Sequence, residues 1–174
     1  MTEVFDRRKQ RTRKAIIQAF NELFFEGELD DIRVADIVAR ANVGRSTFYE
    51  HFGNAQQVFL AAFSYPLSIL AAALAGEGSP DDMEMLLEHL WENRHRARRS
   101  FSGRGREQIS RLLRELLEQR RRTTTVSALT PIQAVGRTEQ AMGLIRAWLL
   151  GELATSGAEL RQALLNIAKE PGRA

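Results

Sequence analysis

The sequence predicts an all-α protein of about nine helices without β-strands, and three observations support this fold class. Apolar residues recur at i, i+3, i+4 and i+7 along most of the chain, which is the spacing of a single buried helix face. Short breaks rich in Gly, Pro or Asn separate these segments, and residues 76–80 are the clearest of them. The β-branched run at 123–127 is polar and indicates a loop rather than a strand.

Length and composition bound the molecule without deciding its function. With 174 residues, of which 44% are hydrophobic, the chain can form one compact domain or two small ones that share a core. The absence of cysteine excludes disulfides and thiolate chemistry. No signal peptide is evident, and the longest apolar runs are shorter than the roughly 20 residues that span a bilayer. We therefore expect a cytoplasmic protein without membrane contact.

The first helix is expected over residues 10–26, with Gly27 ending it. Its apolar residues at helical spacing form one buried face: Ile16, Phe20, Leu23 and Phe24. A second helix is expected at 33–41, and its buried stripe has the same spacing: Val34, Ile37, Val38 and Ala41. Asn42 follows, and asparagine tolerates the left-handed backbone that a tight turn between helices requires.

Residues 43–53 are the most informative stretch of the chain. Phe48 and Phe52 lie four residues apart and share one face, and Gly53 is expected to supply the positive φ that ends the helix. The other face carries basic, hydroxyl and aromatic side chains: Arg45, Ser46, Thr47, Tyr49 and His51. Such side chains contact phosphates or base edges. The pattern therefore predicts a helix at 44–52 that enters a DNA groove as the second half of a helix-turn-helix motif.

The rest of the chain is expected to form further helices connected by short breaks. Asn54 and Gln57 indicate a capping box at the start of the fourth helix, and Pro66 inside that helix should kink or split it. Ser79 and Pro80 indicate the cap and first residue of the fifth helix. The other expected elements are a short helical or irregular link at 94–102, a helix at 104–122, a long helix from Pro131 to about 155, a turn at Gly157 and a last helix at 158–169.

The segments Val34–Ile37, Ala41–Val43 and Ser46–Phe52 together resemble the DNA-binding domain of the TetR family of transcriptional repressors. In that family a run of aromatic, Tyr, any residue, His and Phe closes the recognition helix, and Phe48–Phe52 matches this run. The close match covers about residues 11–60, and the remainder resembles the family only in length and helix layout. The chain departs from the family pattern at four positions, with Arg33 for a capping threonine, Asn42 for glycine, Gly44 for serine and Ala55 for a lysine.

The charge distribution fits an N-terminal DNA-binding domain. The net charge is only +3, but residues 1–14 contain six basic residues against Glu3 and Asp6, and the sign reverses at 20–36. Before a helix-turn-helix, this segment indicates an arm that follows phosphates or enters the minor groove, and a solvated, disordered tail is the alternative. The resemblance then implies two domains: a helix-turn-helix domain with a basic arm at 1–53, and a helical effector-binding and dimerisation domain at 54–174.

The resemblance also implies a set of DNA contacts. Arg45 and Ser46 are expected to read base edges, because they lie near the start of the recognition helix and point outward. The other expected contacts position the DNA, mainly through phosphates: Arg11, Arg13, Arg33, Gly44, Thr47, Tyr49 and His51. For Tyr49 the alternative is a packed aromatic ring, and for His51 a surface histidine.

A homodimer on a palindromic double-stranded DNA operator is a further implication of the resemblance. The two C-terminal helices carry apolar residues on more than one side, which favours a twofold four-helix interface. An ordinary intramolecular core is the alternative for these residues. The expected interface consists of Met142, Ile145, Leu149, Leu153, Leu160, Leu164 and Ile167.

The family resemblance implies a small-molecule effector that is enclosed by helices four to eight and releases the repressor from DNA. The expected pocket residues are Phe63, Tyr65, Met85, His89, Trp91 and Trp148. Ordinary core packing is the alternative, because aromatic residues and methionines at helical spacing usually form core. The C-terminal region is short for the family, so a constitutive DNA-binding dimer without an effector pocket is the alternative function.

Residues 94–122 contain eleven arginines, which the family resemblance does not explain. A solvated face is one interpretation, and a site for an anionic effector or a second nucleic-acid contact is the other. An enzyme is not expected, since the chain has no Gly-rich phosphate loop, no cysteine and only three histidines. No metal and no cofactor are expected for the same reasons.

Overall fold

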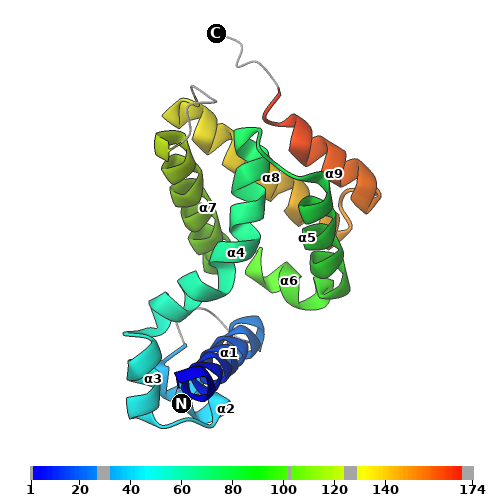
Figure 1. The fold of residues 1–174 in the computed structure, drawn as a ribbon. Helices are drawn as coiled ribbons and strands as arrows, with labels where there is room; N and C mark the ends of the chain where they lie inside the picture. The colour runs from blue at the N-terminus through cyan, green and yellow to red at the C-terminus, as the bar shows by residue number, and fades with distance from the viewer. Residues whose placement is uncertain (1, 27–31, 102, 124–128, 170–174) are drawn as a thin grey trace. The chain divides into compact units, whose positions relative to one another are not determined.

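The computed structural model describes residues 2–26, 32–101, 103–123 and 129–169, and within these ranges it contains nine α-helices and no strand (Figure 1). The predicted all-α class is therefore confirmed. The chain divides into two compact units, Met1–Phe63 and Ser64–Ala174. The expected helix end at Gly27 and most of the loop expected at 123–127 lie outside the described residues.

Unit 1 contains α1 (Thr2–Glu26), α2 (Val34–Ala41), α3 (Arg45–His51) and the first part of α4 (Ala55–Ala75). α1 begins well before the expected residue 10, so the basic arm is helical. The reason is local: this segment holds no Gly or Pro that would interrupt the helix.

Aromatic packing forms much of the core of unit 1. The Phe24 ring centroid lies 6.0 Å from that of Phe20, 6.1 Å from that of Phe59 and 5.1 Å from that of Phe63. Such ring pairs each add about 0.5–1.5 kcal/mol beyond the burial of their area. Phe63, which was expected in the effector pocket, thus belongs to the core beneath the helix-turn-helix. Its position is explained by helical spacing, since Phe59 and Phe63 are four residues apart in α4.

An ion-pair cluster joins α1 to α2 on the surface of unit 1. Arg40 binds the two carboxylate oxygens of Glu26 at 3.1 and 2.8 Å and reaches Glu22 at 3.4 Å. These bonds raise the pKa of Arg40 above its ordinary value, with Glu26 as the largest cause. The acidic charge of this region is therefore partly used within the unit.

α4 is long and apolar enough to cross a membrane by length and composition, contrary to the expectation from the apolar runs. Nearly half of that apolar window is buried in the structure, so α4 is a partly buried core helix. Its buried residues are Val58, Phe59, Leu67, Leu70, Ala71, Ala73 and Leu74. Of the two effects predicted for Pro66, a kink or a split, the split does not occur, because the helix continues through this residue to Ala75. A proline removes only one bond of the helical ladder, and the flanking turns persist.

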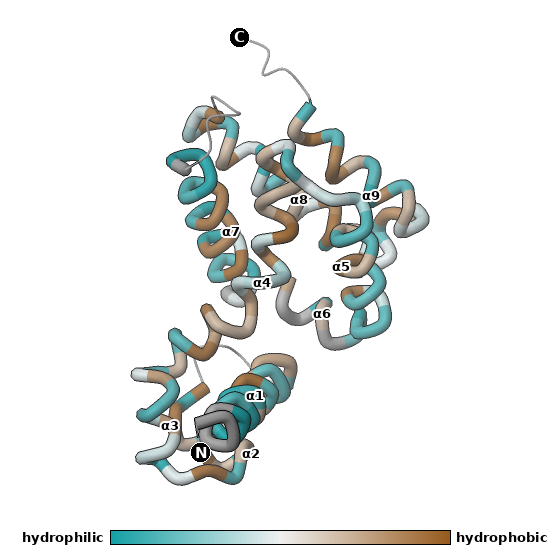
Figure 2. Tube along the Cα trace, viewed as in Figure 1, coloured by the Kyte–Doolittle hydropathy of each residue, from teal (hydrophilic) through white to brown (hydrophobic). Residues whose placement is uncertain are grey.

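Unit 2 contains the rest of α4 and five further helices. These are α5 (Pro80–Glu92), α6 (Arg94–Ser100), α7 (Gly103–Thr123), α8 (Pro131–Leu150) and α9 (Gly157–Asn166). α7 packs against α8, and α5 packs against α9 (Figure 1). Figure 2 shows polar and apolar residues alternating around α7, as its single buried face predicted. Ser79 and Pro80 begin α5 as predicted, and the Ser79 hydroxyl accepts from the Asp82 N–H at 3.4 Å.

α8 ends before the expected residue 155. Gly151 has φ 77°, and its N–H donates to the Trp148 carbonyl at 3.1 Å, so the helix closes with a left-handed glycine. The residues after it form a connection whose last member, Ser156, caps α9. The Gly157 turn expected from the sequence is instead the first residue of α9.

The arginine-rich stretch is engaged mostly in bonds within unit 2. Arg98 donates to the Leu149 carbonyl at 2.6 Å, at the end of α8. The other described ion pairs are Arg106 and Arg114 with Glu139, Arg120 with Glu77, and Arg121 and Arg122 with Glu118. Arg137, outside this stretch, works in the same way and donates to the carbonyls of Leu74 and Ala168 at 2.7 and 3.1 Å. The arginines bonded in these ways stabilise helix ends, helix pairs and α7 itself, which disfavours a broad free site for anions.

Candidate nucleic-acid interface

Backbone hydrogen bonds around Asn42 fix the turn between α2 and α3. Asn42 has φ 52° and ψ 48°, which confirms the predicted left-handed conformation. Its N–H donates to the Ala39 carbonyl at 3.3 Å, and the N–H of Val43 donates to the Val38 carbonyl at 3.2 Å. These two bonds make a Schellman motif, which satisfies the last carbonyls of α2 and sets the direction in which the chain enters α3.

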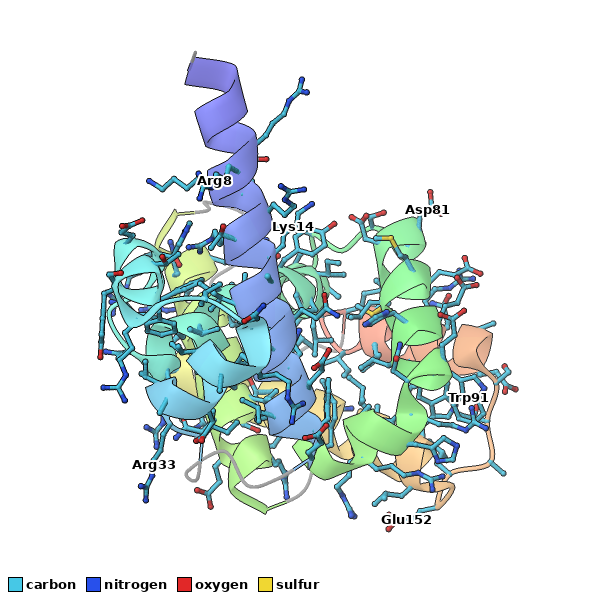
Figure 3. All side chains as sticks on the ribbon, turned by 90° about the horizontal axis from the view of Figure 1, so that it is seen from below. Arg8, Lys14, Arg33, Asp81, Trp91 and Glu152 are labelled. Carbon is cyan, nitrogen blue, oxygen red and sulfur yellow. The ribbon has the colours of Figure 1, made fainter. Side chains whose placement is uncertain are left out.

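The start of α2 is capped by Asp36 rather than by the Arg33 side chain. The Asp36 carboxylate accepts a hydrogen bond from the backbone N–H of Arg33 at 3.0 Å. The Arg33 side chain makes no cap bond and is exposed, and it extends away from the helices (Figure 3). Its guanidinium is therefore accessible to a phosphate, as the DNA contact expected of Arg33 requires.

Two phenylalanines hold α3 against the rest of unit 1. Phe48 is fully buried and Phe52 is 3% exposed, as their four-residue spacing predicted. The helix ends because Phe52 adopts an extended backbone, with φ −145° and ψ 136°. The positive φ predicted for Gly53 is therefore wrong, since the chain has already left the helix. Among the described residues positive φ occurs at Asn42, Gly76 and Gly151.

The connection to α4 is a displaced capping box. The Asn54 side chain accepts from the Gln57 N–H at 2.9 Å, as predicted. The Gln57 side chain accepts from the N–H of Gly53 at 2.7 Å, one residue before the usual partner. α3 and α4 are thus joined by a short, hydrogen-bonded connection.

The outward face of α3 exposes the side chains that were expected to meet DNA. Arg45 and Ser46 are exposed in the first turn, next to the exposed Gly44. Tyr49 is 59% exposed, so it is not a packed core ring, although its edge meets Phe48 at a centroid distance of 5.4 Å. The remaining two expected contacts, Thr47 and His51, are partly buried. The face therefore offers a guanidinium, hydroxyls and an imidazole side by side.

Arg13 of α1 contacts the end of α3. Its guanidinium carbon lies 4.4 Å from the centre of the Phe52 ring, and Nη1 donates to the His51 carbonyl at 3.5 Å. Burial lowers the pKa of His51 below its ordinary value, and the charges of Lys9 and Arg13 lower it further. His51 is therefore neutral at neutral pH. A neutral imidazole donates one hydrogen bond to a phosphate without adding charge.

The other basic residues of α1 have no ion-pair partner in the described part of the chain. Arg7, Arg8, Lys9, Arg11 and Lys14 are all exposed. Figure 3 shows the side chains of Arg8 and Lys14 extending from the helix. Together with Arg33 and Arg45 they give unit 1 a set of accessible cations for a polyanion.

The residues expected at the dimer interface are mostly core of unit 2. Leu153 is 36% exposed, but the other six are at most 3% exposed: Met142, Ile145, Leu149, Leu160, Leu164 and Ile167. The alternative interpretation, an intramolecular core, thus describes these six. The exposed apolar residues of α8 lie on another face, where Ile132 is 85% and Val135 48% exposed. Gly136 and Gly143 share that side of α8 with open space around them.

Two of the expected pocket residues meet in a cavity of about 360 Å³ in unit 2. The Trp91 and Trp148 rings stack with centroids 4.7 Å apart, and Trp148 Nε1 donates to the Thr155 carbonyl at 3.2 Å. The other four expected residues lie elsewhere: Phe63 in the core of unit 1, Tyr65 and Met85 exposed at 67% and 50%, and His89 exposed beside Asn93.

Sequence reasoning missed most of the cavity, because its walls come from two segments that are far apart in sequence, 84–91 and 148–161. The remaining lining residues are Glu84, Leu87, Glu88, Thr155, Ser156, Gly157, Ala158 and Arg161. Glu84 and Arg161, which form an ion pair, are far apart in sequence. The one available signal was the spacing of Glu84, Glu88 and Trp91, which places them on one side of α5. Within the described residues, no group of three or more His, Asp or Glu could hold a metal ion.

Comparison with a family model matches residues 16–62 to the model described as "Bacterial regulatory proteins, tetR family". The uncharacterised HTH-type transcriptional regulator YxbF of Bacillus subtilis (strain 168) is 28% identical over 81 residues. This match covers 46% of the chain but only 21% of YxbF, so the chain matches about a fifth of that relative. The family-model match therefore falls on the helix-turn-helix segment.

Solved structures extend the likeness to the whole fold. A TetR transcriptional regulator from Streptococcus agalactiae 2603V superposes with a TM-score of 0.59 at 22% identity, covering 97% of this chain and 99% of that one. The dihydroxyacetone kinase operon activator DhaS gives a TM-score of 0.51 at 21% identity, covering 91% and 94%. The fatty acid degradation regulator FadR from Bacillus halodurans gives 0.52 at 15% identity, covering 93% and 96%.

Proposed function

Because the chain belongs to the TetR family of bacterial regulatory proteins, which regulate transcription by binding DNA and are not enzymes, we propose that it is a repressor of a palindromic operator. The observation that carries this proposal is the exposed polar face of α3, held from behind by Phe48 and Phe52. Residues 1–53 would then be the DNA-reading part, in the cytoplasm, and 54–174 the regulatory part.

In the proposed complex α3 lies in the major groove. Arg45 and Ser46 read base edges, since both are exposed at the start of the helix. A bidentate arginine–guanine pair is worth about 1–3 kcal/mol of discrimination. Thr47, Tyr49 and His51 contact phosphates, joined by Arg33 and the basic residues of α1 other than Arg13. These phosphate contacts supply affinity that is independent of sequence and falls with added salt.

The operator is read by a homodimer that forms through α8 and the connection that follows it. One recognition helix enters each half-site, so the half-site centres lie about 34–36 Å apart or at a multiple of that distance. The proposed interface uses the exposed side of α8, with Ile132, Val135, Gly136 and Gly143, together with Leu153. Exposed apolar side chains beside glycines allow close helix approach, and this supports the proposal.

A small-molecule effector is proposed to shift the dimer between two spacings of its recognition helices. Such a ligand acts only if it binds one spacing more tightly than the other. Within α4, Pro66 interrupts the hydrogen-bond ladder, which makes it a candidate point for this change. A constitutive DNA-binding dimer is the alternative, and the two differ in whether any ligand alters operator affinity.

Footprinting on the DNA that flanks its own gene, followed by affinity measurement on the protected site, tests the proposal. Arg45→Ala should weaken binding through one base position of each half-site, whereas Tyr49→Phe should weaken binding to all duplexes. Transcription from the footprinted promoter is measured to distinguish repression from activation. The distinction matters because DhaS, which has a similar fold, is an operon activator. If the chain binds every duplex with the same salt-sensitive affinity and prefers no sequence, the proposal is overturned.

A further inference from the structure

The cavity of about 360 Å³ in unit 2 has an apolar floor and a charged rim. Leu87 and Trp148 form its floor and are 2% and 4% exposed. Trp91 stands at its side, 44% exposed, and the ring of Trp148 is fixed by its bond to the Thr155 carbonyl. Sites of about 300–1,000 Å³ with apolar walls and a few polar groups are the usual form of small-molecule pockets.

The residues that line the cavity carry more negative than positive charge. α5 carries five carboxylates and no Lys or Arg, and Figure 3 shows its two ends at Asp81 and Trp91. The lining holds Glu84, Glu88 and Arg161, and the ion pair of Glu84 with Arg161 leaves Glu88 in excess. Within the described residues Glu88 is exposed and has no ion-pair partner. A cationic group at the rim would therefore be attracted.

An anion is disfavoured, although the first residues of α9 line the cavity. The Glu159 carboxylate already accepts from the Ser156 N–H and hydroxyl, both at 2.8 Å, and from the Thr155 hydroxyl at 2.9 Å. The positive end of the helix is thus compensated by a carboxylate of the chain itself. The tryptophan face also prefers cations, and the Arg94 guanidinium carbon already lies 5.0 Å from the Trp91 ring centre.

We propose that this cavity binds an organic cation with an aromatic or aliphatic body, the body on Leu87 and the two tryptophans and the charge beside Glu88. The site is built by α5, α8 and the start of α9. That such a ligand is the effector rests on the proposed function, but the binding itself does not.

Intrinsic fluorescence tests the binding directly, because the chain has two tryptophans and both line the cavity. Benzyltrimethylammonium is titrated into the full chain without DNA, in parallel with neopentylbenzene, its neutral isostere. We expect a saturable change with the cation and at least about fivefold weaker binding of the isostere. Equal binding of the two, or no saturable change, would overturn the proposal.

Matched variants locate the site. Glu88→Gln should weaken binding of the cation about fivefold. Glu92→Gln, on the same helix but outside the cavity, should leave the affinity for the cation unchanged. Gly157→Leu should abolish binding by filling the space, since an added Cβ meets only Trp148, at 4.0 Å. If the two glutamate variants weaken binding equally, the cation is attracted by the overall negative charge of α5, and the proposed site is rejected.

Operator affinity with and without the cation separates this inference from the proposed function. Binding of the cation without any change in operator affinity would support the site and remove its role as the effector pocket. If the chain binds no operator with or without the cation, the repressor proposal is overturned. The proposed cation site is unaffected by that result, because the fluorescence titration contains no DNA.

Discussion

The guanidinium of Arg13 lies 4.4 Å from the centre of the Phe52 ring, where α1 meets the end of α3. The same group donates to the backbone carbonyl of His51 at 3.5 Å. One side chain thus holds both the buried Phe52 and the carbonyl of His51, the last residue of α3. This geometry favours a positioning role for Arg13, in place of the phosphate contact that the sequence predicted.

Substitution of Arg13 separates these roles. Arg13→Met should lower affinity for the footprinted operator about two- to fivefold, because an exposed cation–π contact is worth about 0.5–1 kcal/mol. The slope of log affinity against log salt should stay near the wild-type value. Arg11→Met is the control, since Arg11 is exposed on the same helix and should reduce the slope by about one. If Arg13→Met reduces the salt slope as much as Arg11→Met does, Arg13 contacts a phosphate.

The left-handed Asn42 predicts an unusual mutational order. Asn42→Ala should lower the free energy of unfolding by about 1 kcal/mol, because a residue with a Cβ is strained at positive φ. Asn42→Gly should be as stable as the wild type or slightly more stable, since glycine adopts this conformation readily. Thermal or urea denaturation measures both. Equal destabilisation by Ala and Gly would show that the asparagine side chain, rather than the backbone, stabilises the turn.

The ion pairs of Glu118 should stabilise the fold in a way that is lost in acid. Hydrogen bonds from Arg121 lower the pKa of Glu118 to about 2 from an ordinary 4.5. A depressed carboxyl pKa stabilises the fold above 4.5, and this contribution is lost as the pH falls from 4.5 towards 2. The difference in melting temperature between wild type and Glu118→Gln should therefore be largest above pH 4.5 and shrink below it.

The control for this pH series is Glu115→Gln on the same helix. Glu115 is exposed and has no ion-pair partner among the described residues. Its substitution should give a much smaller difference from wild type, without the same dependence on pH. A pH-independent difference for Glu118→Gln would mean that the Arg121 and Arg122 bonds do not persist in solution.

Local patterns predicted the helices and the turn, but not which partner covers each helix. Phe48 and Phe52, Asn42 and Pro80 each act through neighbours within five residues, so their roles were readable from spacing. Leu149 is buried by other helices of its own unit, and an apolar stripe does not reveal whether a core or a second copy covers it. The cavity at Trp148 escaped prediction because two segments that are far apart in sequence build it.

The dimer is best tested at Gly143 rather than within the buried stripe. Leu149→Glu would place a charge at a fully buried position and unfold unit 2, so monomers of that variant would not locate an interface. Gly143 has no heavy atom within 4 Å of an added Cβ, so the monomer accepts a larger side chain there. Gly143→Glu should therefore fold normally yet sediment as a monomer.

Gly143→Ala is the matched control, because it tests the same position without charge. A single methyl group should leave the protein dimeric, or weaken the dimer only slightly, and should raise helix stability by about 0.5–1 kcal/mol. The operator affinity of Gly143→Glu should fall at least tenfold, since two half-sites are no longer read together. A folded, dimeric Gly143→Glu protein with wild-type operator affinity would exclude this face of α8 and direct the search to other exposed surfaces of unit 2.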